Sequence, residues 1–349
     1  MTSKLIHSTS IFQDGALQEN SWALLTQDQT ITGVGRDWES HSADEIIDGT
    51  DQILHSGLID THCHGAAGFA ANRGVEDIKG ILDFNFSNQV SRTIVSLVSE
   101  DVGAMAKIAT DARALNEDPR FIGIHFEGPF LSHDHRGAQN PAAIKLPTDD
   151  ELTQIIDSGT AVSITLAPEY FTEAQLSRLA SAGIRLCFGH SGADYDLASK
   201  FFGAHPGSVM THTFNGMKGI HHRGPGPIPA ALETETFMEL IADGIHVHDS
   251  VGRLIPKDRL ILVTDAIEAT GQPDGDYLLG VLPITVSRGV ARTESGNLAG
   301  STLKLIDAVK NYAQFSGSQL AAMRAVVTNP AAAYGLVEQE ITLGTHFLL

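Results

Sequence analysis

The stretch GLIDTHCHGAAG at residues 57–68 decides the fold, because an apolar run leads directly into two histidines. Side chains two residues apart in an extended chain point to the same side, so His62 and His64 can reach one cation. Other residues with metal-binding side chains also lie at the ends of apolar, strand-like runs, namely Glu127, His190, His212 and Asp265. The (β/α)8 barrel gathers the carboxyl ends of many strands at one mouth, and its active sites lie there.

Apolar runs of strand length alternate with segments of helical periodicity through most of the chain. We predict eight barrel strands at 53–60, 93–99, 121–126, 162–167, 184–188, 209–213, 237–242 and 260–264, with His212 inside the sixth. We predict helices at 75–86, 103–115, 149–157, 173–182, 195–202, 301–315 and 318–325. Thr148 and Thr172 are expected N-caps, and Gly183 is an expected helix stop. The predicted fold class is α/β, a (β/α)8 TIM barrel.

A second, smaller unit is indicated by strand-like pieces outside this alternation, at 4–12, 21–25, 31–35 and 341–349. We expect the N-terminal segment and the C-terminal end to form a small β-rich module, residues 1–54 plus 337–349. The barrel would then span residues 55–336. A hairpin insertion is expected at 277–293, after the eighth strand.

The amino-acid composition and the net charge exclude several classes of protein. Of 349 residues, 42% are hydrophobic and 19% are charged, which is typical of a folded globule. The net charge of −19 argues against a nucleic-acid surface, which needs a basic face. The N-terminus shows no signal peptide and the chain has no apolar run of about 18 residues, so we expect a cytoplasmic protein without a membrane partner. Cys63 and Cys187 lie in apolar runs and are expected to be reduced core thiols.

The candidate metal ligands form one set at the ends of predicted strands. A single histidine among the 16 in this chain is more often a hydrogen-bonded structural residue than a ligand. The full set in barrel positions is much harder to attribute to chance. Its mixture of imidazole and carboxylate suits Zn²⁺, with Fe²⁺, Mn²⁺ or Co²⁺ as alternatives. The predicted ligands are His62, His64, Glu127, His190, His212 and Asp265.

Sequence blocks in the same order resemble the N-acetylglucosamine-6-phosphate deacetylase family of the amidohydrolase superfamily. The blocks are GLIDTHCHG (57–65), GIHFEGPFLS (123–132), RGAQNP (136–141), GHSGADY (189–195), THTFNGM (211–217), HHRGPG (221–226), ADGIHVH (242–248), LVTDA (262–266) and LAGST (298–302). The predicted strand 162–167 has no lysine, so a carboxylated lysine between two metals is not expected. The resemblance gives that bridging role to Glu127.

The resemblance implies one or two divalent metals and a hydrolytic reaction. His62, His64, Glu127 and Asp265 would hold one metal, and Glu127, His190 and His212 the other. The expected reaction converts N-acetyl-D-glucosamine 6-phosphate to D-glucosamine 6-phosphate and acetate, in amino-sugar catabolism. Water activated by the metal would attack the acetamide. Asp265, the expected catalytic residue, would accept its proton and deliver it to the departing amine.

The resemblance also implies a substrate site shared between two subunits. Arg223 would bind the phosphate of the neighbouring subunit's substrate in a homodimer, because guanidinium matches phosphate geometry. His246 would contact the sugar or the phosphate, and Asn215 and Gly216 would hydrogen-bond the substrate. The remaining expected substrate-binding positions are Ala138, Gln139, Leu298, Ala299 and Gly300.

Two departures from the family pattern leave alternative functions to be considered. Gln139 stands where the family usually has a histidine that helps to polarise the acetyl carbonyl, and nearby His133 or His135 could compensate. The chain also ends at Leu349, earlier than most family chains, so an edge of the small module could be open or covered by a partner. The alternatives are another deacylase of the superfamily, and a non-catalytic homologue that binds sugar phosphate.

Overall fold

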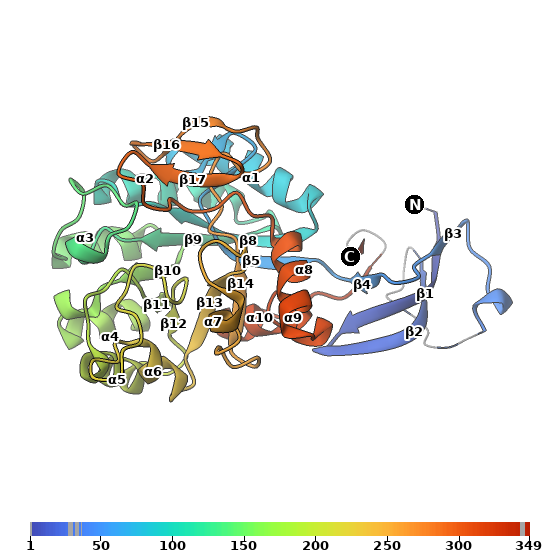
Figure 1. The fold of residues 1–349 in the computed structure, drawn as a ribbon. Helices are drawn as coiled ribbons and strands as arrows, with labels where there is room; N and C mark the ends of the chain where they lie inside the picture. Colours follow the sequence, from blue (N-terminus) through green and yellow to red (C-terminus); the bar gives the residue numbers. More distant parts are fainter. Residues whose placement is uncertain (1, 27–30, 32–34, 36, 343–345) are drawn as a thin grey trace.

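Eight parallel strands form the barrel in the computed structural model, which describes residues 2–26, 31, 35, 37–342 and 346–349 (Figure 1). The strands in chain order are β5 (Leu58–Cys63), β8 (Val90–Leu97), β9 (Phe121–Glu127), β10 (Ala161–Leu166), β11 (Arg185–Phe188), β12 (Val209–Met210), β13 (Phe237–Ile241) and β14 (Leu260–Val263). The backbone N–H of Asp265 donates to the His62 carbonyl at 2.9 Å, and the N–H of His64 donates to Ala266 at 2.8 Å. These bonds join the last strand to the first, so the predicted (β/α)8 fold is confirmed.

Helices follow most barrel strands and cover the outside of the barrel (Figure 1). Thr148 and Thr172 are the N-caps of α3 and α4, as predicted, and each also forms a capping box that satisfies backbone N–H groups at the helix start. No helix among the described residues is long and apolar enough to cross a membrane. The helices are α1 (Val75–Ser87), α2 (Val102–Asp111), α3 (Asp149–Asp157), α4 (Glu173–Ser181), α5 (Tyr195–Ala204), α6 (Ile228–Leu232), α7 (Asp249–Gly252), α8 (Leu305–Ser316), α9 (Gln319–Arg324) and α10 (Thr328–Tyr334).

The main hydrophobic core lies between the strands and the surrounding helices. Phe126 and Phe188 are fully buried there, and burial of a side chain of this size contributes roughly 1.5–3 kcal/mol. Cys63 and Cys187 are buried and unpaired, as predicted. This core fixes the strands, and with them the positions of the polar residues at the strand ends.

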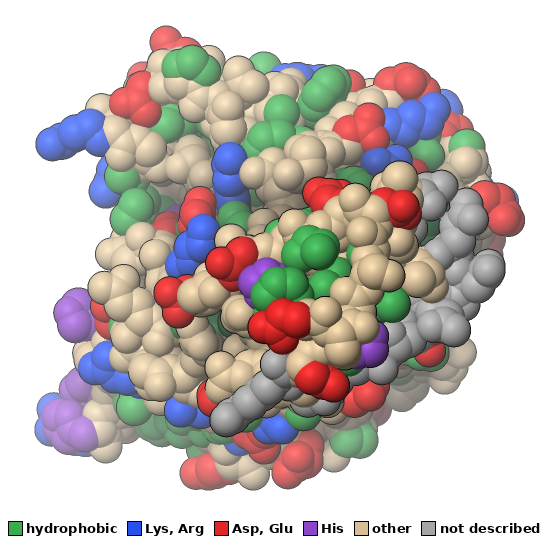
Figure 2. All heavy atoms as spheres, turned by 90° about the vertical axis from the view of Figure 1, so that its right-hand side faces the viewer, with side chains coloured by type: hydrophobic (Ala, Val, Ile, Leu, Met, Phe, Trp, Pro, Cys, Tyr) green, Lys and Arg blue, Asp and Glu red, His purple; other side chains and the backbone are tan. Residues whose placement is uncertain are grey.

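The small module contains a five-stranded sheet that lies beside the barrel and includes both ends of the chain (Figure 1). The C-terminal strand β18 pairs antiparallel with β4, as expected for a segment that returns to the N-terminal module. On the face that carries this module, Lys and Arg are scattered among acidic and polar side chains (Figure 2). The strands are β1 (Lys4–Gln13), β2 (Ala16–Leu25), β3 (Glu45–Asp48), β4 (Ile53–His55) and β18 (Phe347–Leu348).

Several predicted strands differ from the observed ones. The predicted strand 53–60 is wrong as a single strand: it is divided between the small module and the barrel. The backbone turns at Gly57, where φ is 105° and an added Cβ would lie 2.3 Å from Ser91. The predicted hairpin 277–293 is a three-stranded sheet of β15 (Gly275–Leu279), β16 (Leu282–Ser287) and β17 (Val290–Thr293). The predicted piece 31–35 falls largely outside the described residues.

His55, at the end of β4, gives the junction between module and barrel a dependence on pH. Its Nε2 lies 3.0 Å from Gln89 Oε1, and its Nδ1 accepts the N–H of Gly57 at 3.0 Å. A neutral imidazole satisfies both contacts, and burial lowers the pKa of His55 to about 4. Because the unfolded imidazole takes up a proton near pH 6.5, stability is lost as the pH falls from 6.5 towards 4.

We expect the loss from this group between pH 7.5 and pH 5 to be on the order of 2 kcal/mol. The variant His55→Gln has no such titration, so its destabilisation relative to the wild type should be smaller at pH 5 by that amount. Urea unfolding of both proteins at the two pH values measures the difference. Equal destabilisation at both pH values would contradict the assignment.

Candidate metal centre and active-site pocket

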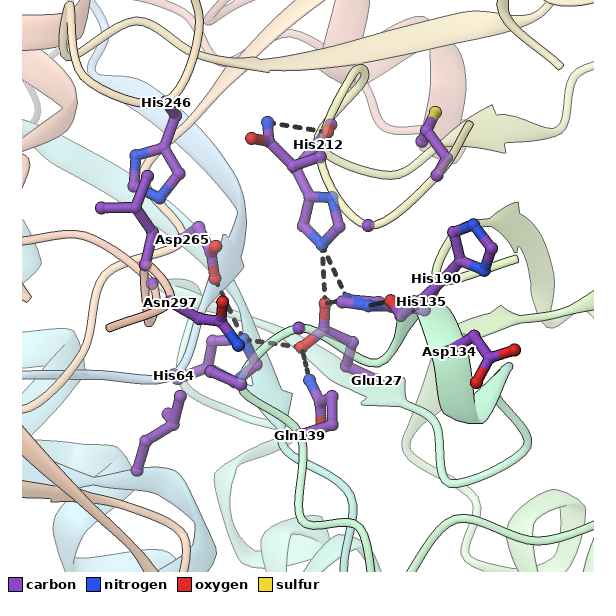
Figure 3. Close-up of a pocket in the computed structure, with 18 residues that line it drawn as sticks. His64, Glu127, Asp134, His135, Gln139, His190, His212, His246, Asp265 and Asn297 are labelled. Carbon is purple, nitrogen blue, oxygen red and sulfur yellow. Dashed lines mark hydrogen bonds and ion pairs between the residues drawn. The ribbon is translucent and has the colours of Figure 1, made fainter. Parts of the chain in front are cut away.

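The six predicted ligands come together at the carboxyl ends of five barrel strands. Figure 3 shows five of them, namely His64, Glu127, His190, His212 and Asp265. All six residues are buried. The prediction that His212 lies inside its strand is wrong, because β12 ends at Met210 and His212 follows two residues later. His62 lies in β5, His64 directly follows that strand, and Glu127 is the last residue of β9. His190 lies two residues beyond the end of β11, and Asp265 lies two residues beyond the end of β14.

One group of donors is formed by the two histidines of the first strand with two carboxylates. His62 Nε2 and His64 Nε2 are 3.1 Å apart. Glu127 Oε2 lies 3.2 Å from His64 Nε2, and Glu127 Oε1 lies 3.5 Å from His62 Nε2. Asp265 Oδ1 lies 3.3 Å from His64 Nε2 and 3.7 Å from His62 Nε2. Four donor side chains thus surround one point.

A second group shares the same glutamate. Glu127 Oε1 lies 3.1 Å from His190 Nε2 and 3.0 Å from His212 Nε2, and the two Nε2 atoms are 3.0 Å apart. Two donors bound to one cation at about 2.1 Å are separated by about 3 Å, which matches both pairs of histidines. Each group therefore has the spacing to hold a divalent cation, and Glu127 belongs to both groups.

Backbone carbonyls fix the orientation of two of these imidazoles. His64 Nδ1 lies 3.1 Å from the Ser96 carbonyl oxygen, and His190 Nδ1 lies 2.9 Å from the His135 carbonyl oxygen. Each Nδ1 must donate to its carbonyl, so the lone pair of the neutral ring is on Nε2. Such outer contacts orient ligands and set their tautomer in metal sites.

Three of the six residues have left-handed backbone conformations. The φ angles are 48° at His190, 25° at His212 and 49° at Asp265. Non-glycine residues rarely adopt such angles, and the cost is of the order of 1–3 kcal/mol each. This geometry turns the chain sharply after β11, β12 and β14. Residues held in such strained conformations cluster at functional sites.

The electrostatic environment keeps the two carboxylates ionised. Burial opposes ionisation of Glu127, but His62, His190 and His212 hold its pKa well below the usual range. Burial also opposes ionisation of Asp265, whose pKa is lowered by contact with His64 and by the charge of His62. No lysine or arginine is buried in the described part of the chain. The histidines are therefore the only basic side chains that the described structure places beside these carboxylates, and a bound cation would add positive charge to theirs.

A cavity of about 360 Å³ opens above the donor groups (Figure 3). Most of the predicted substrate-binding residues line it, namely Ala138, Gln139, Asn215, Gly216, His246, Leu298 and Gly300. Ala299 is fully buried beside the cavity and does not line it. Five further lining residues were not assigned to the site from the sequence, namely Asp134, Gly137, Met217, Leu279 and Asn297, and His135, weighed there only as a substitute for a missing histidine, lines the cavity as well.

The side-chain amide of Gln139 is not free, because its nitrogen is hydrogen-bonded to Glu127. The Gln139 Nε2 donates a short hydrogen bond to Glu127 Oε2, and the Gln139 Oε1 accepts the N–H of Ser99 at 2.8 Å. Because Ser99 fixes the oxygen end, the donor end must face the carboxylate. A contact between this amide and a substrate carbonyl stays a prediction. His135 lines the cavity, but its carbonyl oxygen is engaged by His190.

His246 and Asn215 present defined polar groups to the cavity. His246 Nδ1 lies 2.6 Å from Asp243 Oδ2. Burial disfavours the cationic imidazole, but this contact raises the pKa of His246. Asn215 Nδ2 donates to the His212 carbonyl at 3.1 Å, which turns its side-chain oxygen outward as an acceptor.

Arg223 lies away from this cavity on an exposed loop. Its Nη1 is 2.6 Å from His222 Nε2. Among the residues that line the cavity in the described structure, none is lysine or arginine. Within this lining a phosphate would therefore meet histidines such as His246, and a guanidinium or ammonium group would have to come from outside it.

Comparisons with known proteins agree on one family. The chain is 33% identical over 307 residues to an N-acetylglucosamine-6-phosphate deacetylase of Vibrio furnissii, covering 84% of this chain and 76% of that protein. It is 34% identical over 278 residues to an N-acetylgalactosamine-6-phosphate deacetylase of Escherichia coli O157:H7, covering 76% and 74%. A solved mutant N-acetyl-D-glucosamine-6-phosphate deacetylase of Mycobacterium smegmatis, in complex with N-acetyl-D-glucosamine-6-phosphate, has a TM-score of 0.90 at 28% identity, covering 100% and 95%. No protein-family model matches the chain.

Proposed function

Because this chain belongs to the N-acetylglucosamine-6-phosphate deacetylase family of the amidohydrolase superfamily, we propose that it hydrolyses N-acetyl-D-glucosamine 6-phosphate to D-glucosamine 6-phosphate and acetate. The observation that carries the proposal is the convergence of the donor side chains with Asp265 beneath one cavity. A non-catalytic role would not require two buried, mutually repelling carboxylates, or strained backbone conformations at His190, His212 and Asp265. The converging donors are His62, His64, Glu127, His190, His212 and Asp265.

The two donor groups would hold one or two divalent cations, with Zn²⁺ best suited and Fe²⁺, Mn²⁺ or Co²⁺ as alternatives. When bound, a divalent cation lowers the pKa of water and polarises a carbonyl oxygen. Asp265 faces the same point with an ionised oxygen, so it would accept a proton from the attacking water. The same carboxyl would then give that proton to the departing amine nitrogen. Gln139 would keep Glu127 in place throughout.

The sugar phosphate would be held by side chains around the cavity and by the neighbouring subunit. His246, kept basic by Asp243, would face the sugar or the phosphate. Arg223 lies outside the cavity of its own chain, which supports its proposed role in the cavity of a partner in a homodimer. The Asn215 side-chain oxygen would accept a hydrogen bond from a sugar hydroxyl, and the backbone at Gly216 and 298–300 would complete the contacts.

The function is tested by comparing acetate release from N-acetylglucosamine 6-phosphate and from unphosphorylated N-acetylglucosamine. We expect the phosphorylated sugar to have a kcat/KM at least about 100-fold higher, because a guanidinium–phosphate contact and His246 bind only that substrate. In Arg223→Ala, we expect KM for the phosphorylated sugar to rise about tenfold or more, with kcat changed little. The preference for the phosphorylated sugar should fall by the same factor.

Arg253→Ala is the matched control, since Arg253 is another exposed arginine whose Nη1 donates to the Phe315 carbonyl. Its kinetics should equal those of the wild type. Equal rates on both sugars would overturn the phosphate-specific function and favour another deacylase of the superfamily. An unchanged KM in Arg223→Ala would remove this residue from the site.

A second candidate substrate is N-acetylgalactosamine 6-phosphate, because the chain is equally similar to a deacetylase named for that sugar. The two substrates differ only in the configuration of the hydroxyl at C4. The acetamide and the phosphate are common to both, so the donor groups, Asp265 and Arg223 would act alike. The ratio of kcat/KM for the two sugars decides which one the cavity prefers.

A further inference from the structure

A buried glutamate below the cavity has no part in the mechanism above. Glu239 lies in the middle of β13, inside the apolar run FMELI, and is 2% exposed. It does not line the cavity, so it would not touch the substrate. A carboxylate in such a place is costly unless its oxygens are satisfied.

Three hydrogen-bond donors surround this carboxylate. The backbone N–H of His212 donates to Glu239 Oε2 at 3.2 Å. His62 Nδ1 lies 3.2 Å from the same oxygen. The hydroxyl of Thr61 donates to Oε1 at 3.2 Å. Glu239 therefore contacts one member of each donor group, by a side chain in His62 and by the backbone in His212.

The contact with His62 determines how that imidazole can act. If His62 Nδ1 donates to Glu239, the lone pair of the ring is on Nε2, which faces His64 Nε2 at 3.1 Å. His64 and His190 are oriented instead by neutral carbonyl oxygens. A carboxylate partner withdraws more of the Nδ1 proton than a carbonyl does, so it makes the opposite nitrogen a stronger donor.

We propose that Glu239 is a positioning residue that sets the affinity of the His62–His64–Glu127–Asp265 group for its divalent cation. The proposal rests on the proposed metal-dependent function. Glu239 acts through His62 and its negative charge, while the Glu127–His190–His212 group binds its cation without that help. The backbone contact with His212 needs only an acceptor oxygen.

The charges of the surrounding residues support this role. Glu127, Asp265 and Glu239 are buried within one region of the barrel. In the described ranges, no buried lysine or arginine offsets them. Glu268, another buried glutamate, differs because it forms an ion pair with Arg73. The negative charge of Glu239 would therefore be balanced by His62 and by the divalent cation that His62 would hold.

The test is Glu239→Gln, which retains the shape of the side chain. The glutamine oxygen can accept from His62 and His212, and its amide can donate to the Thr61 hydroxyl, so the hydrogen bonds survive and only the charge is lost. We expect one of two zinc ions to bind about 10- to 100-fold more weakly, and the other to bind as in the wild type. Zinc content after dialysis against a series of buffered zinc concentrations measures both affinities.

Glu268→Gln is the matched control, since it neutralises a buried glutamate that contacts no candidate ligand. It should bind both zinc ions as the wild type does. Circular dichroism of the metal-free proteins checks the fold, and if Glu239→Gln does not fold, Glu239→Asp withdraws the carboxylate from His62 and should show the same selective loss.

The outcomes separate this proposal from the function on which it rests. A wild-type protein that binds no divalent metal would remove the proposed function itself. Two tightly bound zinc ions in the wild type and in the folded Glu239 variant would overturn the role of Glu239 alone. Equal weakening of both zinc ions would also overturn it, because that result indicates a general structural role.

Discussion

Replacing Asp265 by asparagine is expected to lower kcat by on the order of 10³-fold, within the range for loss of a general acid–base group. The carboxylate lies 3.3 Å from His64 Nε2, and contact with the imidazoles keeps its pKa below the usual range. Asp265 is therefore ionised at neutral pH, and its carboxylate can accept a proton from water acidified by a bound cation. The amide of asparagine has the same shape but cannot accept that proton, so it cannot deliver one to the nitrogen as the C–N bond breaks.

The measurement is acetate release from the phosphorylated sugar, together with the zinc content of each protein. Asp134→Asn is a suitable control, because Asp134 also lines the cavity but lies outside the donor groups. We expect it to retain more than about a tenth of the wild-type kcat. An Asp265→Asn enzyme with comparable activity would refute the proton-transfer role. Restoring its zinc content without restoring turnover would separate catalysis from metal binding.

The barrel and the donor groups were predictable because both follow from simple patterns. Buried parallel strands appear as continuous apolar runs, and the carboxyl ends of such strands meet at one mouth. A histidine or carboxylate at the end of such an apolar run is therefore predicted to lie at the mouth of the barrel. The convergence of His62, Glu127 and His190 in the structure follows this rule.

Other parts of the site depend on contacts that sequence patterns do not encode. The length of β12 could not be read from its apolar residues, because the turn at His212 requires a left-handed backbone angle. Asn297 also lines the cavity; it directly precedes the predicted substrate-binding residues 298–300, but the matching sequence block begins only at Leu298. Gln139 was expected beside the substrate. Its contact with Glu127 depends on the orientation of the amide, which is fixed by the hydrogen bond from the Ser99 N–H and cannot be read from the sequence.

The position of Glu239 inside an apolar run could have indicated from the sequence that this residue is a candidate for supporting the site. A single carboxylate inside the apolar run FMELI must be buried if the run is a barrel strand. A buried carboxylate needs donors, and the neighbouring strand ends supply histidines. Charged residues inside predicted barrel strands are therefore candidates for the support of a metal site. Asp60, in the run LID, follows the same rule and accepts hydrogen bonds from Thr264.

Replacing Glu127 by glutamine should remove both cations, because its carboxylate contacts the histidines of both donor groups. Oε1 lies 3.0 Å from His212 Nε2 and 3.1 Å from His190 Nε2, while Oε2 lies 3.2 Å from His64 Nε2. An amide carries no charge, and its NH₂ group would face either imidazole nitrogen lone pairs or the NH₂ group of Gln139. We therefore expect both zinc affinities to fall by more than the roughly 100-fold typical of residues that only orient a ligand.

Zinc titration of Glu127→Gln beside Glu239→Gln distinguishes a shared ligand from a positioning residue. The first variant should lose both ions and fall below about 1% of wild-type acetate release, and the second should lose one ion selectively. The metal-free Glu127→Gln protein should fold as well as the metal-free wild type, since the substitution removes a buried negative charge that lacks a lysine or arginine partner among the described residues. Retention of either zinc ion at wild-type affinity would show that Glu127 does not join the two groups.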